Sequence, residues 1–130
     1  THLSEEEIVG KSEFLREFLN DFSDNIELHE KIENTKVIEL IKGSDVGLLP
    51  TWADSYGYSC LEFQACGCPV ISTDVRSLPE INNDKCGWVI PVAKNNTGLD
   101  AKLNTDEDRL EFSKQFLLIP MEGLKSIKKV

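Results

Sequence analysis

Residues 44–92 read SDVGLLPTWADSYGYSCLEFQACGCPVISTDVRSLPEINNDKCGWVIPV, and this stretch decides the fold. It contains three short apolar runs that hardly alternate with polar residues, as is typical of strands buried on both faces of a parallel sheet; these are 45–50, 69–73 and 87–92. Between them lie a helical segment, from about 59 to 66, and a short helical turn that begins at Ser77. Strands that alternate with helices through short connections predict an α/β fold with a parallel sheet and helices on both faces.

The flanking sequence adds a fourth strand and three helices. Helical spacing, cap residues and terminal glycines predict a helix over 4–22, a strand over 26–29, a helix over 35–43 and a helix from 105 to about 119 within a tail of 105–130. Thr105 and Asp108 have the spacing of a reciprocal cap at the start of the last helix. Gly67 is placed to end the helix over 59–66. The sheet should therefore have about four strands.

Composition places the chain in a broad class. With 130 residues and 40% hydrophobic content, it fits a single domain over 1–130. The net charge of −9, from 14 basic and 23 acidic residues, argues against a nucleic-acid partner. The spacing of the four cysteines, at 60, 66, 68 and 86, differs from the usual paired zinc pattern, so we expect no metal and free thiols in a reducing cytoplasm.

The ends of the chain also shape the expectations. The sequence has no apolar run long enough for a membrane span, and its acidic N-terminus differs from a secretion signal, which favours a cytoplasmic location. It starts at Thr1 rather than at methionine, and we interpret it as part of a longer polypeptide.

Within residues 44–92, the longest connection after a predicted strand is PTWADSYGYS, residues 50–59, and it is the candidate ligand site. Ligands of open parallel sheets bind beyond the carboxyl ends of the strands, where this loop should lie. Gly57 allows close approach of the backbone, and the next helix begins there with unpaired N–H groups that suit a phosphate. Asp54 and Glu62 flank this anion site, where carboxylates would accept hydrogen bonds from hydroxyl groups. Hydroxyls on both sides of phosphates describe a nucleotide sugar.

The same stretch resembles the signature region of the group 1 (family four) retaining glycosyltransferases, which have the two-domain GT-B fold. The features that carry the resemblance are Asp54 with seven residues before Glu62, followed by an Ala-Cys-Gly-x-Pro-Val-Ile segment, a Pro-Glu-Ile and a Gly-x-x-x-Pro. They keep fixed offsets over residues 44–92, with a weaker extension back to about Ile26. The resemblance implies that the chain is part of a Rossmann-like, C-terminal, donor-binding domain.

The resemblance also implies roles for individual residues. Asp54 would contact hydroxyls of the donor sugar as the catalytic-site acid, and Glu62 would contact the ribose. The loop that holds the diphosphate would consist of Ser55, Tyr56, Gly57 and Tyr58. The base-binding segment would fall near His29 to Ile32, with Lys31 and Ile32 as base contacts. No cofactor or obligatory metal is implied, because the nucleoside-diphosphate sugar is a substrate.

The sequence differs from the usual family pattern at three positions near the candidate site. Most members have glutamate where Asp54 stands, and Arg76 and Ser77 replace a common Gly-Gly pair. We therefore expect the loop after 69–73 to be less permissive in φ, and leave open a contact between Arg76 and a ligand.

The family's diphosphate-neutralising arginine and lysine, and its acceptor-binding domain, lie upstream of this sequence. The chain alone should be inactive, while its parent would be a hexosyltransferase of carbohydrate biosynthesis, with peripheral membrane association as an option.

Other readings remain open at this stage. Asp54 could cap the turn that follows it, and Glu62 could be a solvated helix residue. The whole chain could be a non-catalytic binding or interaction module that keeps the fold. An aspartate phosphoacceptor domain is disfavoured, because Asp45 begins its predicted strand instead of ending it. The sequence does not indicate the sugar, base, acceptor or oligomeric state.

Overall fold

A computed structural model describes residues 5–21, 23–54 and 56–117. The chain divides into two compact units, Thr1–Ile32 and Glu33–Val130, and each is described here by itself. The expectation of a single domain over 1–130 stays a prediction.

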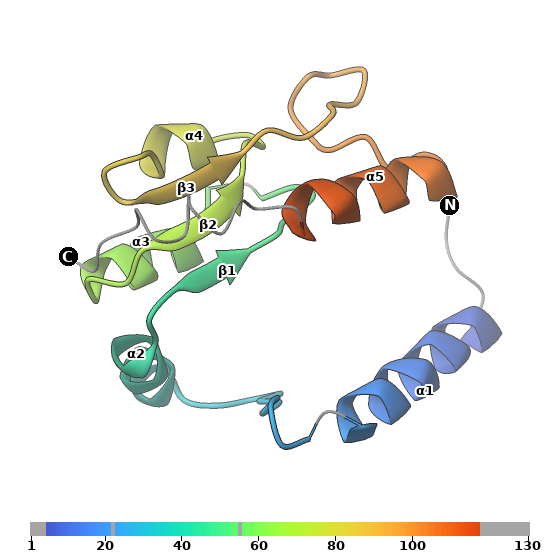
Figure 1. Cartoon of the computed structure of the whole chain (residues 1–130), viewed down its shortest axis with the longest axis horizontal. Coiled ribbons are helices and arrows are strands. Elements are labelled where there is room, and N and C mark those ends of the chain that lie inside the picture. Colours follow the sequence, from blue (N-terminus) through green and yellow to red (C-terminus); the bar gives the residue numbers. More distant parts are fainter. Residues whose placement is uncertain (1–4, 22, 55, 118–130) are drawn as a thin grey trace. The chain divides into compact units, whose positions relative to one another are not determined.

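The first unit contains helix α1, Glu5–Asp21, drawn in blue in Figure 1. This confirms the helix expected over 4–22, although Ser4 and Phe22 lie outside the described residues. The strand expected over 26–29 is wrong, because these four residues are exposed and pair with none of the described strands. Alternation of Ile, Glu and Leu is compatible with a strand, but only hydrogen bonds to a neighbouring strand make one.

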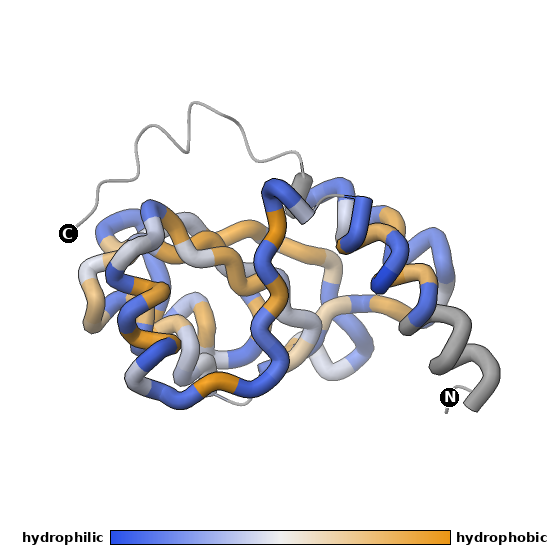
Figure 2. Tube along the Cα trace, turned by 90° about the horizontal axis from the view of Figure 1, so that it is seen from below, coloured by the Kyte–Doolittle hydropathy of each residue, from blue (hydrophilic) through white to orange (hydrophobic). Residues whose placement is uncertain are grey.

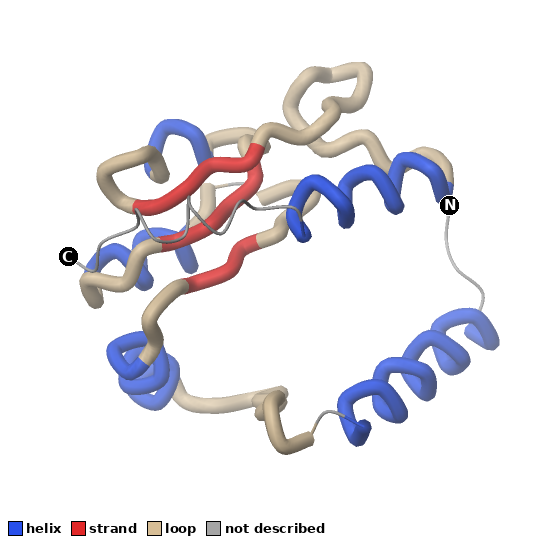
Figure 3. The backbone as a smooth tube through the Cα atoms, in the orientation of Figure 1, coloured by secondary structure: helices blue, strands red, loops and turns tan. Residues whose placement is uncertain are grey.

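The second unit is built on a parallel sheet with the order β1-β2-β3, comprising Gly47–Leu49, Val70–Thr73 and Gly87–Ile90. Figure 3 shows these strands side by side in red. Four helices flank them: α2 (Asn34–Gly43), α3 (Tyr58–Ala65), α4 (Leu78–Ile81) and α5 (Asp106–Leu117). The α/β fold class is confirmed, with three strands in the described part of the chain instead of about four.

Two consecutive β-α-β crossovers position α3 and α4. Because such crossovers are right-handed and the sheet grows in one direction, both helices fall on the same face of the sheet. The Phe63 ring of α3 lies directly over Gly47, where an added Cβ would stand 2.6 Å from the ring. Gln64 of α3 donates a hydrogen bond of 2.7 Å to the carbonyl of Ile81 in α4. These contacts fix the start of α3 relative to the sheet.

The core lies within the second unit. Its buried members come from every strand but β1 and from α3, α4 and α5, namely Cys60, Val70, Ile71, Val75, Leu78, Ile90, Val92, Ala101 and Phe112. All four residues of β2 are buried, as expected for a central strand. The alternation of apolar and polar residues along the chain is visible in Figure 2.

The predicted helix boundaries are confirmed at two places. After α3, Gly67 has φ 69°, and its N–H donates to Gln64 while that of Cys68 donates to Phe63. This pair of bonds is the Schellman arrangement that ends a helix at a glycine. At α5, Thr105 and Asp108 bond reciprocally, each side chain accepting from the other residue's N–H. Residues 118–130 of the predicted tail lie outside the described residues.

Candidate functional site

The loops that follow the three strands are tied together at the carboxyl edge of the sheet. The Thr73 hydroxyl, at the end of β2, donates a 2.7 Å hydrogen bond to the carbonyl of Thr51. The N–H of Ala101, beyond β3, donates to the carbonyl of Trp52 at 2.9 Å. Loop 50–57 is therefore held where ligands of open parallel sheets bind.

Asp54 holds the turn that leads into α3. Its Oδ1 accepts hydrogen bonds from the N–H of Tyr56 at 3.1 Å and from the N–H of Gly57 at 2.9 Å. The turn-capping role that the sequence left open for Asp54 is therefore present. As a consequence, the Gly57 N–H is already used and is not among the unpaired N–H groups expected at the start of the next helix.

Gly57 is the residue where the loop becomes a helix. It has φ 81°, in the left-handed region, and an added Cβ would stand 2.6 Å from Leu78 Cδ2. Glycine is therefore required both by the backbone conformation and by the close approach to α4. Within the described residues, the N–H groups of Tyr58 and Ser59 have no acceptor, whereas the N–H of Cys60 donates to Gly57 at 3.0 Å. Two N–H groups thus remain for an anion.

Tyr56 and Tyr58 form an aromatic pair on the surface beside this helix start. Their ring centroids are 5.2 Å apart, and the residues are 49% and 71% exposed. Neither ring packs beneath the loop. Ser55, between Asp54 and Tyr56, lies outside the described residues.

Glu62 follows Tyr58 by one helical turn, so it lies on the same side of α3 and away from the buried Cys60. Its side chain is half-buried and has no hydrogen-bond or ion partner within the described part of the chain. The two cavities described for this unit, beside α5 and beside the end of α3, include neither Asp54 nor Glu62. The expectation that these two acids flank one ligand site stays a prediction.

Arg76 lies in the loop after β2, which we expected to avoid the φ values that favour glycine. It has φ 46°, so replacing a glycine did not remove the left-handed backbone. Its N–H donates to the carbonyl of Leu99 at 3.0 Å, and its guanidinium forms a two-pronged pair with the Asp100 carboxylate. These bonds offset the conformational cost. The hydrogen bond from Arg76 also holds the pKa of Asp100 below its ordinary value.

Two further cations near this edge are engaged in the same way. Lys94 pairs with Asp74, whose Oδ1 also accepts from the N–H of Val92. Lys102 lies 3.5 Å from Asp108. The positive charges of the loops after β2 and β3 are thus already matched by carboxylates.

Residues 94–101 have a role at this edge that the sequence pattern alone did not predict. Lys94 and Ala101 form an antiparallel bridge, and the loop between them turns at Gly98, which has φ 73°. The Asn95 side chain accepts a 3.1 Å hydrogen bond from the N–H of Thr97 within that turn. The run Asn-Asn-Thr-Gly at 95–98 is typical of a turn and was the available signal. Its bonds to Trp52 and Arg76 appear only in the tertiary structure.

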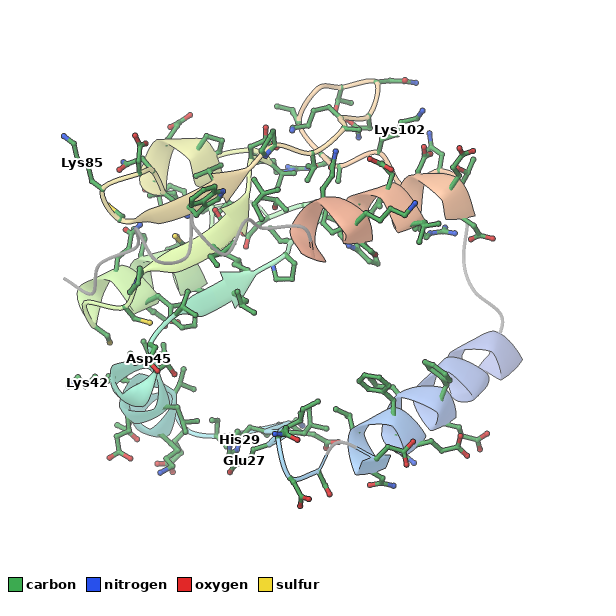
Figure 4. The ribbon with its side chains drawn as sticks, in the orientation of Figure 1. Glu27, His29, Lys42, Asp45, Lys85 and Lys102 are labelled. Atoms are coloured by element: carbon green, nitrogen blue, oxygen red, sulfur yellow. The ribbon has the colours of Figure 1, made fainter. Side chains whose placement is uncertain are left out.

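The residues expected near the base belong to the first unit. Lys31 and Ile32 are exposed, and His29 Nε2 lies 3.1 Å from Glu27 Oε1. Figure 4 labels His29 and Glu27. Contact of these residues with a base therefore stays a prediction.

Metal-binding clusters and membrane-spanning helices are both absent from the described residues. No group of three or more His, Cys, Asp or Glu side chains there is arranged to hold a metal ion. None of the described helices combines the length and the apolar character that a membrane crossing needs.

The fold and the edge loop define a Rossmann-like α/β class, and comparison with known proteins narrows it. The family described as glycosyl transferases group 1 matches residues 5–104. The chain therefore belongs to the group 1 glycosyltransferases. This match confirms the group 1 glycosyltransferase family that the motifs of residues 44–92 suggested. The retaining mechanism and the family four assignment stay predictions.

Part of the chain is also similar in sequence to curated proteins that are named as glycosyltransferases. The chain is 30% identical over 80 residues, 59% of its length, to a D-inositol 3-phosphate glycosyltransferase of Paenarthrobacter aurescens. It is 27% identical over 67 residues, 51% of its length, to the Mycobacteroides abscessus protein of that name. The aligned segments cover 20% and 15% of those relatives. The similarity concerns a small part of each relative.

Proposed function

We propose that this chain is the nucleotide-sugar-binding part of a retaining glycosyltransferase of the family four type, within a GT-B C-terminal domain. The parent enzyme would transfer a sugar from a nucleoside-diphosphate donor to an acceptor. Membership of the group 1 family supports this proposal. The observation that carries it is the start of α3, where the Tyr58 and Ser59 N–H groups have no acceptor among described residues and Asp54 and Glu62 flank them.

In this proposal the diphosphate binds at the start of α3. The N–H groups of Tyr58 and Ser59 donate to it, aided by the positive end of the helix dipole. Asp54 Oδ1 holds the turn through Tyr56 and Gly57, while its Oδ2, which has no partner among the described residues, accepts from a sugar hydroxyl. In this proposal Ser55 belongs to the same diphosphate-binding loop. The exposed rings of Tyr56 and Tyr58 border the same site.

Glu62 anchors the ribose of the donor. A half-buried carboxylate without a partner in the described part of the chain carries a desolvation cost, which hydrogen bonds from the ribose hydroxyls would offset.

The parent protein supplies the charge that this edge lacks. A leaving diphosphate needs positive charge, and the helix end, equivalent to roughly half a charge, does not provide enough. Arg76, Lys94 and Lys102 are paired with aspartates. We infer that basic residues and an acceptor domain come from the remainder of a longer polypeptide. The chain alone does not catalyse sugar transfer. The parent enzyme acts in carbohydrate biosynthesis in the cytoplasm, and peripheral association with a membrane is compatible with this role.

Calorimetry with the full chain tests the donor site. Titration with UDP-, GDP- and ADP-sugars should give micromolar binding to one of them. Glu62→Gln should weaken that binding by about tenfold or more, because it removes a charge-assisted hydrogen bond to the ribose. Glu80→Gln is the matched control, since Glu80 is exposed on the neighbouring α4, and should bind like the parent sequence.

The alternative is a non-catalytic interaction module of the same family. It predicts no binding of any sugar nucleotide by protein whose circular dichroism and cooperative melting show that it is folded. Equal weakening by Glu62→Gln and Glu80→Gln would also contradict the assigned role of Glu62.

A further inference from the structure

An ion pair with two hydrogen bonds lies at the carboxyl edge of the sheet. Arg76 belongs to the loop after β2 and Asp100 to the loop after β3, and Figure 3 shows these two strands side by side. Nη2 of the guanidinium donates to Oδ2 of the carboxylate at 2.8 Å, and Nε donates to Oδ1. The two side chains are 39% and 24% exposed, so a dissolved anion reaches the pair from the surface.

The Asp100 side of the pair is attached to the loop of the proposed donor site. Ala101, the next residue along the chain, donates its N–H to the carbonyl of Trp52 at 2.9 Å. Trp52 belongs to loop 50–57, which leads into α3. The carboxylate therefore lies one residue away from a backbone bond to the donor loop.

The Arg76 side of the pair adjoins the start of α3. Leu78, two residues after Arg76, packs so closely on Gly57 that an added Cβ there would stand 2.6 Å from the leucine side chain. Arg76 also keeps a left-handed backbone, with φ 46°. Non-glycine residues held in such a conformation cluster at ligand sites. The arginine thus stands beside the helix start whose N–H groups we assign to the diphosphate.

The chemistry of the pair suits an exchange of anions. The planar guanidinium binds phosphate oxygens in the same two-pronged way as it binds a carboxylate. An ion pair that is open to water contributes little net free energy, because solvent screens it. A diphosphate carries more negative charge than one aspartate, so it can take the place of the Asp100 carboxylate.

The other two cations of this edge fit this role less well. Lys94 donates to the carbonyl of Val92 at 2.7 Å as well as to its aspartate, so it is fixed at two points. Lys102 lies beside Asp108, whose carboxylate caps α5. Neither lysine has the two-pronged geometry that a phosphate group matches.

We propose that Arg76 is a donor-binding residue, whose guanidinium leaves Asp100 and binds the diphosphate held at the start of α3. Asp100 is then the counterion of Arg76 in the absence of the donor, and it competes with the donor for the guanidinium. This inference rests on the proposed function. It adds one positive charge from this chain to those that we assign to the remainder of the parent. Because Arg76 stands where the family commonly has glycine, the family pattern does not predict this contact.

Calorimetry with the full chain tests the exchange, with UDP, GDP and ADP as the probes. For a diphosphate that binds, Arg76→Gln should weaken binding by about tenfold, because two charge-assisted hydrogen bonds are lost. Asp100→Asn should strengthen binding by about threefold, because the competing ion pair is removed. Both variants break the same pair, so a purely structural pair predicts effects of the same sign.

Two control variants separate this exchange from a general change in charge. Arg76→Gln combined with Asp100→Asn should bind like Arg76→Gln alone, because Asp100 acts only through the arginine. Asp84→Asn removes an exposed carboxylate before β3, at the opposite end of the strand, and should bind like the parent sequence.

The outcomes distinguish this inference from the function on which it rests. An equal gain from Asp100→Asn with and without Arg76, effects of the same sign in the two single variants, or no change in Arg76→Gln would overturn the role of Arg76 and leave the donor site standing. If the unsubstituted chain binds none of the three diphosphates, the donor site itself is wrong, and this inference falls with it.

Discussion

At the scale of single residues, Asp54 has two carboxylate oxygens, and the turn uses one of them. Oδ1 accepts from the N–H groups of Tyr56 and Gly57. A capping role and a ligand role are therefore compatible, because each oxygen of an ionised carboxylate is an independent acceptor. An acid is required for the proposed donor contact, and the cap explains how a side chain shorter than glutamate is held in a defined place.

Gly57 allows a prediction with a matched control in the same unit. Gly57→Ala should destabilise the fold by about 1–3 kcal/mol through left-handed strain, with a further cost from overpacking against Leu78. Gly98→Ala carries a similar strain, at φ 73°, but its added Cβ meets nothing within 4 Å. Urea unfolding of both variants measures the difference. Equal losses would mean that Leu78 moves aside and that only backbone strain matters.

At the scale of elements, α5 begins with a reciprocal cap and places Phe112 in the core. Thr105→Ala removes the hydroxyl that accepts from the Asp108 N–H at 3.1 Å. The expected cost is about 1 kcal/mol of unfolding free energy, since an orphan N–H loses its partner. Chemical denaturation monitored by circular dichroism at 222 nm measures it.

Ser113→Ala is the control for α5, because its hydroxyl bonds back to Arg109 within the same helix at 3.0 Å. Alanine is the better helix former there, so this variant should be neutral or slightly more stable. A loss as large as that of Thr105→Ala would show that hydroxyl removal in general, and not the cap, is responsible.

At the scale of the whole molecule, every core residue found in the described part of the chain belongs to the unit Glu33–Val130. A chain shortened to residues 33–130 should therefore fold and unfold cooperatively by itself. Trp52 and Trp88 both lie in this unit, so tryptophan fluorescence and near-ultraviolet circular dichroism report on it directly. A shortened chain that keeps helical signal but loses the near-ultraviolet bands would show that residues 1–32 are needed for fixed packing.

The sequence by itself determined the features that depend on local pattern: the three apolar strands, α3 with its glycine stop, and the reciprocal cap of α5. It also determined the family, because the motifs of residues 44–92 keep fixed offsets along the chain. These features follow from neighbours in sequence, whose geometry the backbone fixes.

Only the tertiary structure decided the rest. Residues 26–29 have a strand-like pattern but pair with none of the described strands, and Arg76 holds a left-handed conformation through its bonds to Leu99 and Asp100. Each depends on groups brought together by folding, above all on the loops joined at the carboxyl edge of the sheet. Hydrogen-bond competition of this kind is settled by positions in space, which no spacing along the chain encodes.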